Sequence, residues 1–196
     1  MIEFKHILRQ IPNLEKCDTL DIFAREGNWQ SFIMNDKVNS IEAWEIDKKF
    51  IPKLKENLPN AIVKCKDSIS FINNSTNYKK FDLIIIDNGL NCYGNNYCEH
   101  FDFLHNIKYF LKKTGYIVFN VVIHPFNYKN NKLWQSRRNN FYNLSDCSHL
   151  SHEFVETFYK NFFTKAGMKT TQYQTLCREY HNGIDYLYYV GMQLEQ

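Results

Sequence analysis

Acidic residues follow four successive apolar segments of the chain, at positions where their side chains could bind one ligand together. They are Asp21 with Glu26, Glu45 with Asp47, Asp67, and Asp87. In an open parallel sheet, ligands bind beyond the carboxyl ends of the strands. There, Glu45 can accept hydrogen bonds from ribose hydroxyls and Asp67 from an adenine amino group, while Asp21 or Glu26 can face an ammonium or sulfonium group. The series therefore favours a ligand that carries a sugar and a base.

The turn after the first apolar segment argues against a dinucleotide. A pyrophosphate needs a glycine-rich turn that opens a helix, so that backbone N–H groups can face it. This turn holds a single glycine, Gly27, and the acidic Glu26 stands beside it. Acids at helix N-termini also serve as simple caps, and that interpretation stays open for each acid taken alone. Taken together, the acids favour a nucleoside ligand without phosphate.

The elements that must position these acids alternate between strands and helices, as in βαβ units of a parallel sheet. Apolar segments rich in β-branched residues predict the strands, and amphipathic stretches predict the helices. The predicted strands are residues 19–23, 40–46, 61–66 and 81–86, and the predicted helices are 30–34, 48–57 and 70–73. Asp67 and Ser68 are placed to cap the third helix. We expect the unbroken apolar run 81–86 to form a central strand that is covered on both faces.

The second half continues this pattern and then changes direction. Apolar residues at helical spacing predict a helix over residues 97–113 that stops at Lys112-Lys113-Thr114-Gly115, followed by a strand over 116–123. A further helix is predicted over 152–166. The last two apolar segments, 169–177 and 186–194, have no helix between them, so they must pair antiparallel. The predicted fold is α/β, a Rossmann-like and mostly parallel sheet with an antiparallel C-terminal strand and helices on both faces.

Residues 124–151 lack a regular pattern, and a segment of that length is typical of a lid or a binding loop. It interleaves aromatic and cationic side chains, which could stack on a planar acceptor or hold an acidic one. These are Trp134, Arg137, Arg138, Phe141 and Tyr142. The alternative is a solvent-facing helix whose apolar side packs on the edge of the sheet, and we favour this alternative slightly.

The composition predicts one soluble domain over residues 1–196. The chain is 44% hydrophobic, and its 24 basic and 21 acidic residues give a net charge of +3, which provides little reason to expect nucleic acid as the partner. The six cysteines lack a closely spaced pair, so we expect reduced thiols and no metal site. Without a secretory-signal pattern or the roughly 20 apolar residues that span a bilayer, we expect a cytoplasmic protein away from membranes.

In this order, the motifs resemble those of class I S-adenosylmethionine-dependent methyltransferases. Residues 20–28 are similar to the first motif of that family, Glu45 matches its second acid, Asp67 its third, and residues 81–88 its fourth-strand motif. The resemblance implies S-adenosylmethionine as the cofactor and a set of residues that bind it. That set is Asp21, Phe23, Ala24, Arg25, Glu26, Gly27, Glu45, Ile46, Asp67, Ser68 and Asp87.

The departure from the family lies in the glycines of the first motif. The family has three alternating glycines, whereas Phe23 and Arg25 occupy the first two positions here and only Gly27 is present. A side chain at position 25 would limit how closely the backbone approaches the methionine end of the ligand. Arg25 could pair with the ligand carboxylate or with Glu26, or it could be an ordinary surface residue.

Methyl transfer is an in-line displacement, so the protein mainly has to align two groups and, where needed, remove a proton. Asp87 is placed to orient an acceptor, and His124, after the fifth strand, is the best-placed histidine for a base, with a neutral loop histidine as the alternative. His149 and His152 are lesser candidates. The resemblance disfavours a metal mechanism, because the Asp-Asn pair of metal-dependent relatives is missing after the fifth strand.

Three functional hypotheses follow. The first is methyl transfer to an oxygen or nitrogen atom of a small metabolite or sugar, favoured by the short chain and the small net charge. The second is methylation of RNA or protein, for which Arg137 and Arg138 would be the footprint. The third is a non-catalytic binding module or partner subunit that keeps the fold as a scaffold, as the missing glycines would allow.

Overall fold

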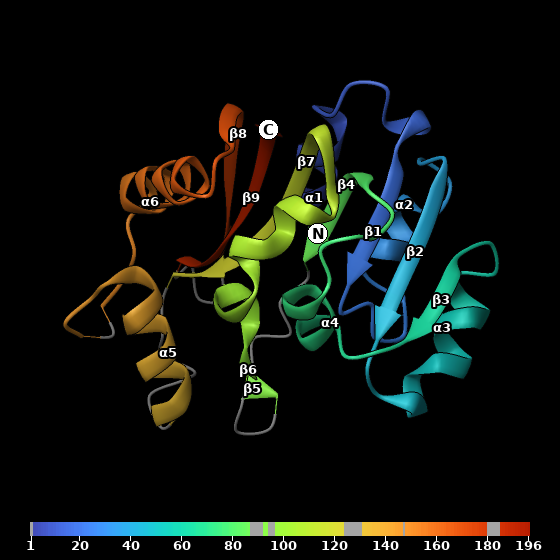
Figure 1. Ribbon diagram of the computed structural model, residues 1–196, viewed down its shortest axis with the longest axis horizontal. Coiled ribbons are helices and arrows are strands. Elements are labelled where there is room, and N and C mark those ends of the chain that lie inside the picture. The colour runs from blue at the N-terminus through green and yellow to red at the C-terminus, as the bar shows by residue number, and fades with distance from the viewer. Residues whose placement is uncertain (1, 87–91, 94–96, 124–130, 147, 180–184) are drawn as a thin grey trace.

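A twisted, mostly parallel sheet forms the centre of the molecule (Figure 1). The computed structural model describes residues 2–86, 92–93, 97–123, 131–146, 148–179 and 185–196. Seven strands form this sheet in the order β3-β2-β1-β4-β7-β9-β8. They are β1 (Asp18–Ile22), β2 (Ser40–Glu45), β3 (Ile62–Cys65), β4 (Phe81–Ile86), β7 (Leu111–Val122), β8 (Lys169–Glu179) and β9 (Asp185–Glu195). A separate pair, β5 (Cys92–Tyr93) and β6 (Tyr97–Cys98), is antiparallel.

Strand direction follows the predicted pattern. β1, β2, β3, β4 and β7 run parallel to one another, while β9 is antiparallel to both β7 and β8. The chain reverses between β1 and β4, because β2 and β3 lie on one side of β1 and the later strands lie on the other. This reversal is the place where α/β sheets bind their ligands. The predicted Rossmann-like sheet with its antiparallel C-terminal pair is confirmed.

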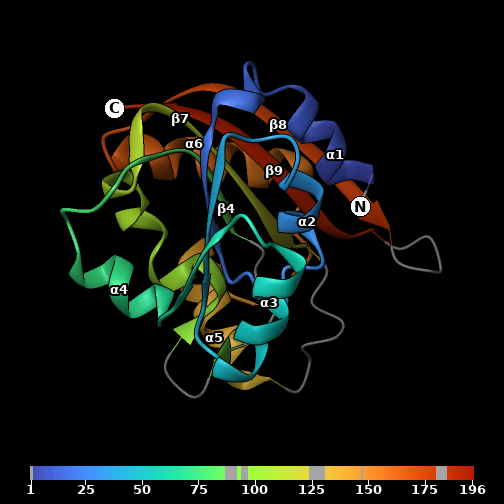
Figure 2. The same ribbon diagram turned by 90° about the vertical axis from the view of Figure 1, so that its right-hand side faces the viewer.

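Helices cover both faces of the sheet, as Figure 2 shows with the strands seen nearly edge-on. The helices are α1 (Ile2–Arg9), α2 (Gln30–Met34), α3 (Ile51–Asn57), α4 (Ser68–Asn74), α5 (Lys132–Tyr142) and α6 (His152–Lys165), and the 3₁₀ helices span Leu14–Lys16, Lys48–Phe50, Glu99–Asp102 and Leu104–Tyr109. One apolar cluster packs α1, α2 and α3 on the sheet, and the other packs α4, α5 and α6 on the opposite face. The three-layer arrangement is therefore confirmed.

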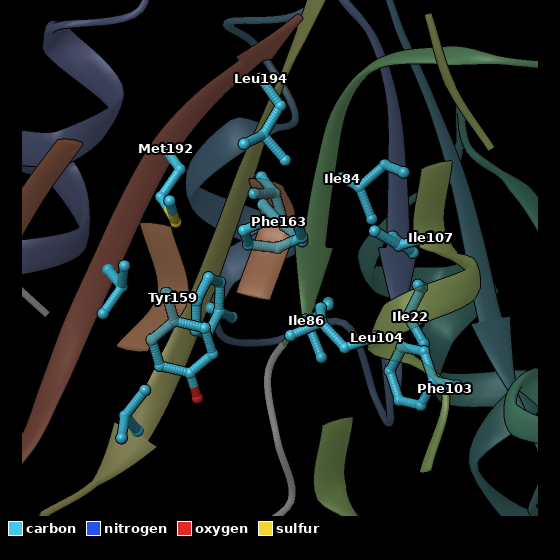
Figure 3. Close-up of a cluster of buried hydrophobic side chains, with 14 of the residues drawn as sticks. Ile22, Ile84, Ile86, Phe103, Leu104, Ile107, Tyr159, Phe163, Met192 and Leu194 are labelled. Carbon is cyan, nitrogen blue, oxygen red and sulfur yellow. The ribbon is translucent and has the colours of Figure 1, made fainter. Parts of the chain in front are cut away.

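The apolar cluster that packs α4, α5 and α6 on the sheet reaches the carboxyl ends of the central strands. Figure 3 shows Ile22, the last residue of β1, and Ile86, the last residue of β4, together with Phe103 in this cluster. All three side chains are fully buried. The core thus fixes the strand ends from which the acidic residues project.

The prediction of one helix over residues 97–113 is wrong. The structure has β6, two 3₁₀ helices and then β7, which begins at Leu111, so the expected helix stop at Lys112-Lys113-Thr114-Gly115 lies inside a strand. The apolar residues Phe101, Leu104, Ile107 and Phe110 recur every three residues. That spacing matches the 3.0 residues per turn of a 3₁₀ helix better than the 3.6 of an α-helix.

Helix α1 lies against β8 and β9, and one glycine allows its close approach. A Cβ atom on Gly191 of β9 would lie 2.6 Å from Cγ2 of Ile7. We expect Gly191→Ala to lower the free energy of unfolding by about 1–3 kcal/mol in urea titrations, because the branched Ile7 side chain cannot move aside. Ile7 is buried, so Ile7→Ala is itself destabilising, and the double variant should lose less stability than the sum of the two single variants. A Gly191→Ala variant with the free energy of unfolding of the wild type would contradict this packing of α1.

Candidate functional site

The loop after β1 keeps its left-handed residues although it lacks two of the three glycines. The φ angles are 80° at Phe23, 51° at Arg25 and 67° at Gly27. These are the three alternating positions at which class I S-adenosylmethionine-dependent methyltransferases, the family that the motif resembles, have glycine. Glycine is the residue that adopts positive φ without strain. At Gly27 itself, a Cβ atom would lie 2.6 Å from Cδ1 of Leu54, so the third glycine is also required for space. The missing glycines therefore change the side chains of the loop and leave its alternating backbone pattern in place.

Glu45 holds this loop from the end of β2. Its Oε2 accepts the backbone N–H of Arg25 at 2.8 Å, and its Oε1 accepts the backbone N–H of Asp47 at 2.7 Å. Glu45 is 7% exposed, so its carboxylate is nearly buried. A carboxylate has about four acceptor positions, and these two contacts leave capacity for ribose hydroxyls. The predicted ribose-binding acid thus also orients the loop after β1.

Arg25 turns its side chain away from the loop. Its guanidinium carbon lies 5.1 Å from the ring centroid of Phe50, beyond β2, and the residue is exposed. Lys49 lies over the same ring, at 4.7 Å. Of the alternatives for Arg25, the structure places it as a surface cation stacked on an aromatic ring.

The two acids associated with the loop after β1 occupy different environments. Asp21 is 1% exposed and accepts a hydrogen bond from the Ser31 hydroxyl of α2. Glu26 is half-buried and accepts from the Asn28 side chain at 3.2 Å, and its backbone carbonyl accepts from Asn57 at 2.8 Å. Asp21 therefore lies beneath the loop, whereas Glu26 lies at its rim.

Asp67 is a helix cap, as one of the two interpretations had it. Its Oδ1 accepts the backbone N–H of Ser70 at 3.1 Å at the start of α4, and Ser68 is 3% exposed. A backbone hydrogen bond links the residue before Asp67 to Glu45, since Lys66 donates its N–H to the carbonyl of Glu45 at 2.9 Å. Because β1, β2 and β3 are neighbours, Asp21, Glu45 and Asp67 share one edge of the sheet.

A cage of aromatic rings beside Asp67 is filled by a lysine, which the sequence did not reveal. The ammonium of Lys66 lies 3.4 Å from the ring centroid of Phe71, 4.3 Å from that of Trp44 and 5.0 Å from that of Tyr78. Burial and the nearby Lys64 lower the pKa of Lys66. The rings stabilise the partly desolvated cation and fix the end of β3.

The acceptor side of the site is described only in part. Asp87 and His124, the predicted orienting residue and base, lie outside the described residues. His152, a lesser candidate for the base, packs against two tyrosine rings. Its ring centroid lies 5.7 Å from that of Tyr188 and 6.5 Å from that of Tyr173. Within the described ranges, no group of three His, Cys, Asp or Glu side chains could hold a metal ion.

A buried polar chain beside the end of β4 was missed by the sequence analysis. His100 is fully buried, its Nε2 lies 2.5 Å from the Tyr159 hydroxyl, and that hydroxyl lies 2.6 Å from the Tyr142 hydroxyl. The ring of His100 also lies 5.4 Å from that of Phe119, the residue paired with Ile86 at the end of β4. Burial lowers the pKa of His100 to about 3, so its imidazole is neutral at physiological pH.

The two arginines of the predicted binding segment are not free cations. Arg138 is fully buried, donates to the Ser148 carbonyl at 2.7 Å and lies 5.6 Å from the ring centroid of Trp134. Arg137 forms an ion pair with Asp102 at 3.2 Å. Both belong to α5, whose Trp134 and Tyr142 are also buried. Residues 132–142 of this segment are therefore a helix, and both of its arginines have partners within the protein.

Comparisons with known proteins show the class of the fold. No family model matches the sequence, and no curated protein matches it. Among solved structures, TYW2 of M. jannaschii in complex with AdoMet is 18% identical, with 100% of this chain and 75% of that chain covered and a TM-score of 0.61. The N-methyltransferase NodS of Bradyrhizobium japonicum WM9 is 10% identical over 98% of this chain and 94% of that chain, with a TM-score of 0.65.

A third similar structure, the plantazolicin methyltransferase BamL in complex with SAH, is 11% identical over 98% of this chain and 81% of that chain, with a TM-score of 0.59. The chain therefore has the Rossmann-like fold of class I S-adenosylmethionine-dependent methyltransferases. At these identities the likeness establishes the fold, and the acceptors of the similar proteins differ. Among the described residues, no helix is both long and apolar enough to cross a membrane.

Proposed function

We propose that this protein binds S-adenosylmethionine at the carboxyl edge of β1, β2 and β3 and transfers its methyl group to a small acceptor. The observation that carries the proposal is the loop after β1, whose left-handed residues 23, 25 and 27 are tied by the Arg25 N–H to Glu45. A nearly buried carboxylate with free acceptor capacity suits a ribose. The donor set therefore fits a nucleoside that bears no phosphate.

The residues proposed to bind the cofactor have distinct roles. Glu45 and the backbone of Ile46 would hold the ribose, Asp67 and Ser68 the adenine, and Asp21 with the loop after β1 the methionine end. The loop members are Phe23, Ala24, Arg25, Glu26 and Gly27, and Asp87 completes the proposed set. S-adenosylmethionine, when bound, supplies a methyl group on a positively charged sulfur. The protein has to hold the acceptor in line and exclude water from the contact.

We propose an oxygen or nitrogen atom of a small metabolite or sugar as the acceptor. Two cations that would mark an RNA site are engaged, since Arg138 is fully buried and Arg137 is paired with Asp102. Methylation of RNA or protein is the alternative, because the fold that this chain shares with the similar structures does not restrict the acceptor. Residues 124–151 are the proposed lid, and α5 within them packs beside His100 through Phe141, with ring centroids 5.4 Å apart.

Asp87 and His124 stay the proposed orienting residue and base. His100 is unsuited to be the base, because a pKa of about 3 leaves almost no affinity for a proton at neutral pH. The scaffold hypothesis rested on the missing glycines, and it loses that support because the loop retains positive φ angles at positions 23 and 25. We propose the cytoplasm as the compartment of one domain over residues 1–196.

The test is transfer of a radiolabelled methyl group from S-adenosylmethionine to separate pools of small metabolites, sugars, transfer RNA and protein. We expect label in a small-molecule pool from the wild type and much less from Glu45→Ala at the same concentration of S-adenosylmethionine. Label in transfer RNA or protein instead would replace the proposed acceptor class. Tight binding of the cofactor without transfer to any pool would favour the scaffold.

A further inference from the structure

The first residue after β1 combines a bulky side chain with a backbone conformation that favours glycine. Phe23 has a φ of 80°, and an aromatic residue there is strained where glycine would not be. Strained residues persist where the surrounding structure holds them, and they gather at functional sites. The strain at Phe23 therefore raises the question of what its ring does.

The ring of Phe23 is held from one side. It meets Phe103 edge to face, with ring centroids 5.8 Å apart and planes at 79°. Phe103 is fully buried in the core at the carboxyl end of β1, beside Ile22 in Figure 3, whereas Phe23 is half-buried. The core thus fixes the orientation of the Phe23 ring and leaves part of it at the sheet edge that carries the proposed cofactor site.

Other rings at this edge already have a cation from the protein. Phe50 has Arg25 and Lys49, and Phe71 has Lys66. In the described part of the chain, no cationic side chain lies over Phe23. An aromatic ring attracts a cation through the negative charge of its face, and the attraction grows when water is excluded.

We propose that Phe23 forms the aromatic wall of the sulfonium subsite and makes the pocket prefer S-adenosylmethionine to S-adenosylhomocysteine. This inference rests on the proposed function. The two ligands differ by one methyl group and one positive charge, so the cation–π attraction of a ring that contacts the sulfonium acts on S-adenosylmethionine only. Asp21, buried two residues earlier, would add attraction for the same charge, and substitutions at Phe23 leave it in place. The ring occupies a position where the resembling family has a glycine and no side chain.

The test is calorimetric titration of both ligands into the wild type, Phe23→Leu and Phe23→Tyr. Leucine keeps an apolar contact with Phe103 and removes the π-face, whereas tyrosine keeps the face. We expect Phe23→Leu to weaken S-adenosylmethionine by about 3- to 30-fold and S-adenosylhomocysteine by less than about 2-fold, and Phe23→Tyr to bind both like the wild type. Phe32→Leu is the matched control, because Phe32 is 60% exposed on α2 and should affect neither ligand.

Equal weakening of both ligands in Phe23→Leu would show that Phe23 only supports the loop, and it would overturn the inference, as would no change in either. A wild type that binds neither ligand would refute the proposed function itself, which is a distinguishable result. Should Phe23→Leu fail to fold, Phe23→Gly replaces it, since glycine adopts a φ of 80° without strain. The same loss of selectivity is then expected.

Discussion

The His100→Phe variant is expected to lose much less stability than the wild type when the pH falls from 7 to 4. Burial lowers the pKa of His100 to about 3, whereas a histidine in an unfolded chain titrates near pH 6.5. Acid therefore favours the unfolded chain, because its His100 side chain binds a proton at pH values where the buried imidazole of the folded chain stays neutral. The stability due to neutral His100 is fully present above about pH 6.5 and is lost as the pH falls toward about 3, by about 1.4 kcal/mol per unit.

Urea titrations at half-unit steps of pH measure this effect. Between pH 6.5 and 4 the wild type should lose about 3 kcal/mol more than the variant. At pH 7 the variant should itself be less stable by about 1–3 kcal/mol, because the Tyr159 hydroxyl loses its imidazole partner. His6→Gln is the control, since His6 is exposed on α1 and its replacement should preserve the wild-type pH dependence. Parallel curves for the wild type and His100→Phe would refute the burial of a neutral imidazole.

The second large effect is expected at Glu45. Glu45→Ala should lower the free energy of unfolding by about 2–4 kcal/mol, because the N–H groups of Arg25 and Asp47 lose their acceptor in a nearly buried position. Glu45→Gln keeps one acceptor oxygen, so about half of that loss is expected. Urea titration at pH 7 provides the measurement.

Glu26→Ala is the matched control for Glu45. Glu26 lies at the rim of the same loop and accepts one exposed hydrogen bond, from Asn28, so its removal should change stability by less than about 0.5 kcal/mol. Similar losses at both positions would mean that Glu45 has no special part in holding the loop after β1.

The parallel half of the sheet could be predicted from the sequence because its strands are buried apolar runs. Residues 81–86 form β4 with the predicted bounds, and five of these six side chains are buried. The helix over residues 30–34 also has its predicted bounds as α2, and residues 152–166 form α6 to within one residue. In these segments local preference and tertiary burial agree.

The segment between β4 and β7 could not be predicted in the same way. The apolar spacing of three residues after Phe101 matches a 3₁₀ helix better than an α-helix, but over so short a stretch it also satisfies the pattern by which an α-helix is predicted. The start of β7 at Leu111 depends on its pairing with Phe81, a contact across 30 positions that local sequence does not encode.

In the candidate site, the sequence predicted which acidic residues lie at the ends of the strands but not the groups to which they are hydrogen-bonded. Glu45 and Asp67 were identified from their place after strands, and the structure adds the N–H groups that they accept. The chain of His100, Tyr159 and Tyr142 joins three distant segments, so only the fold could reveal it. A signal existed in Phe23 and Arg25, since a motif that loses two glycines must either lose its shape or carry strain.

The central claim is that the carboxyl edge of β1, β2 and β3 binds S-adenosylmethionine through Glu45. Calorimetric titration of S-adenosylmethionine and S-adenosylhomocysteine into the wild type and Glu45→Ala tests it most directly, at a temperature where both variants are shown to be folded. We predict micromolar binding to the wild type and a loss of at least about tenfold in the variant, equal to about 1.4 kcal/mol. No binding to the folded wild type, or equal binding to both proteins, would contradict the account.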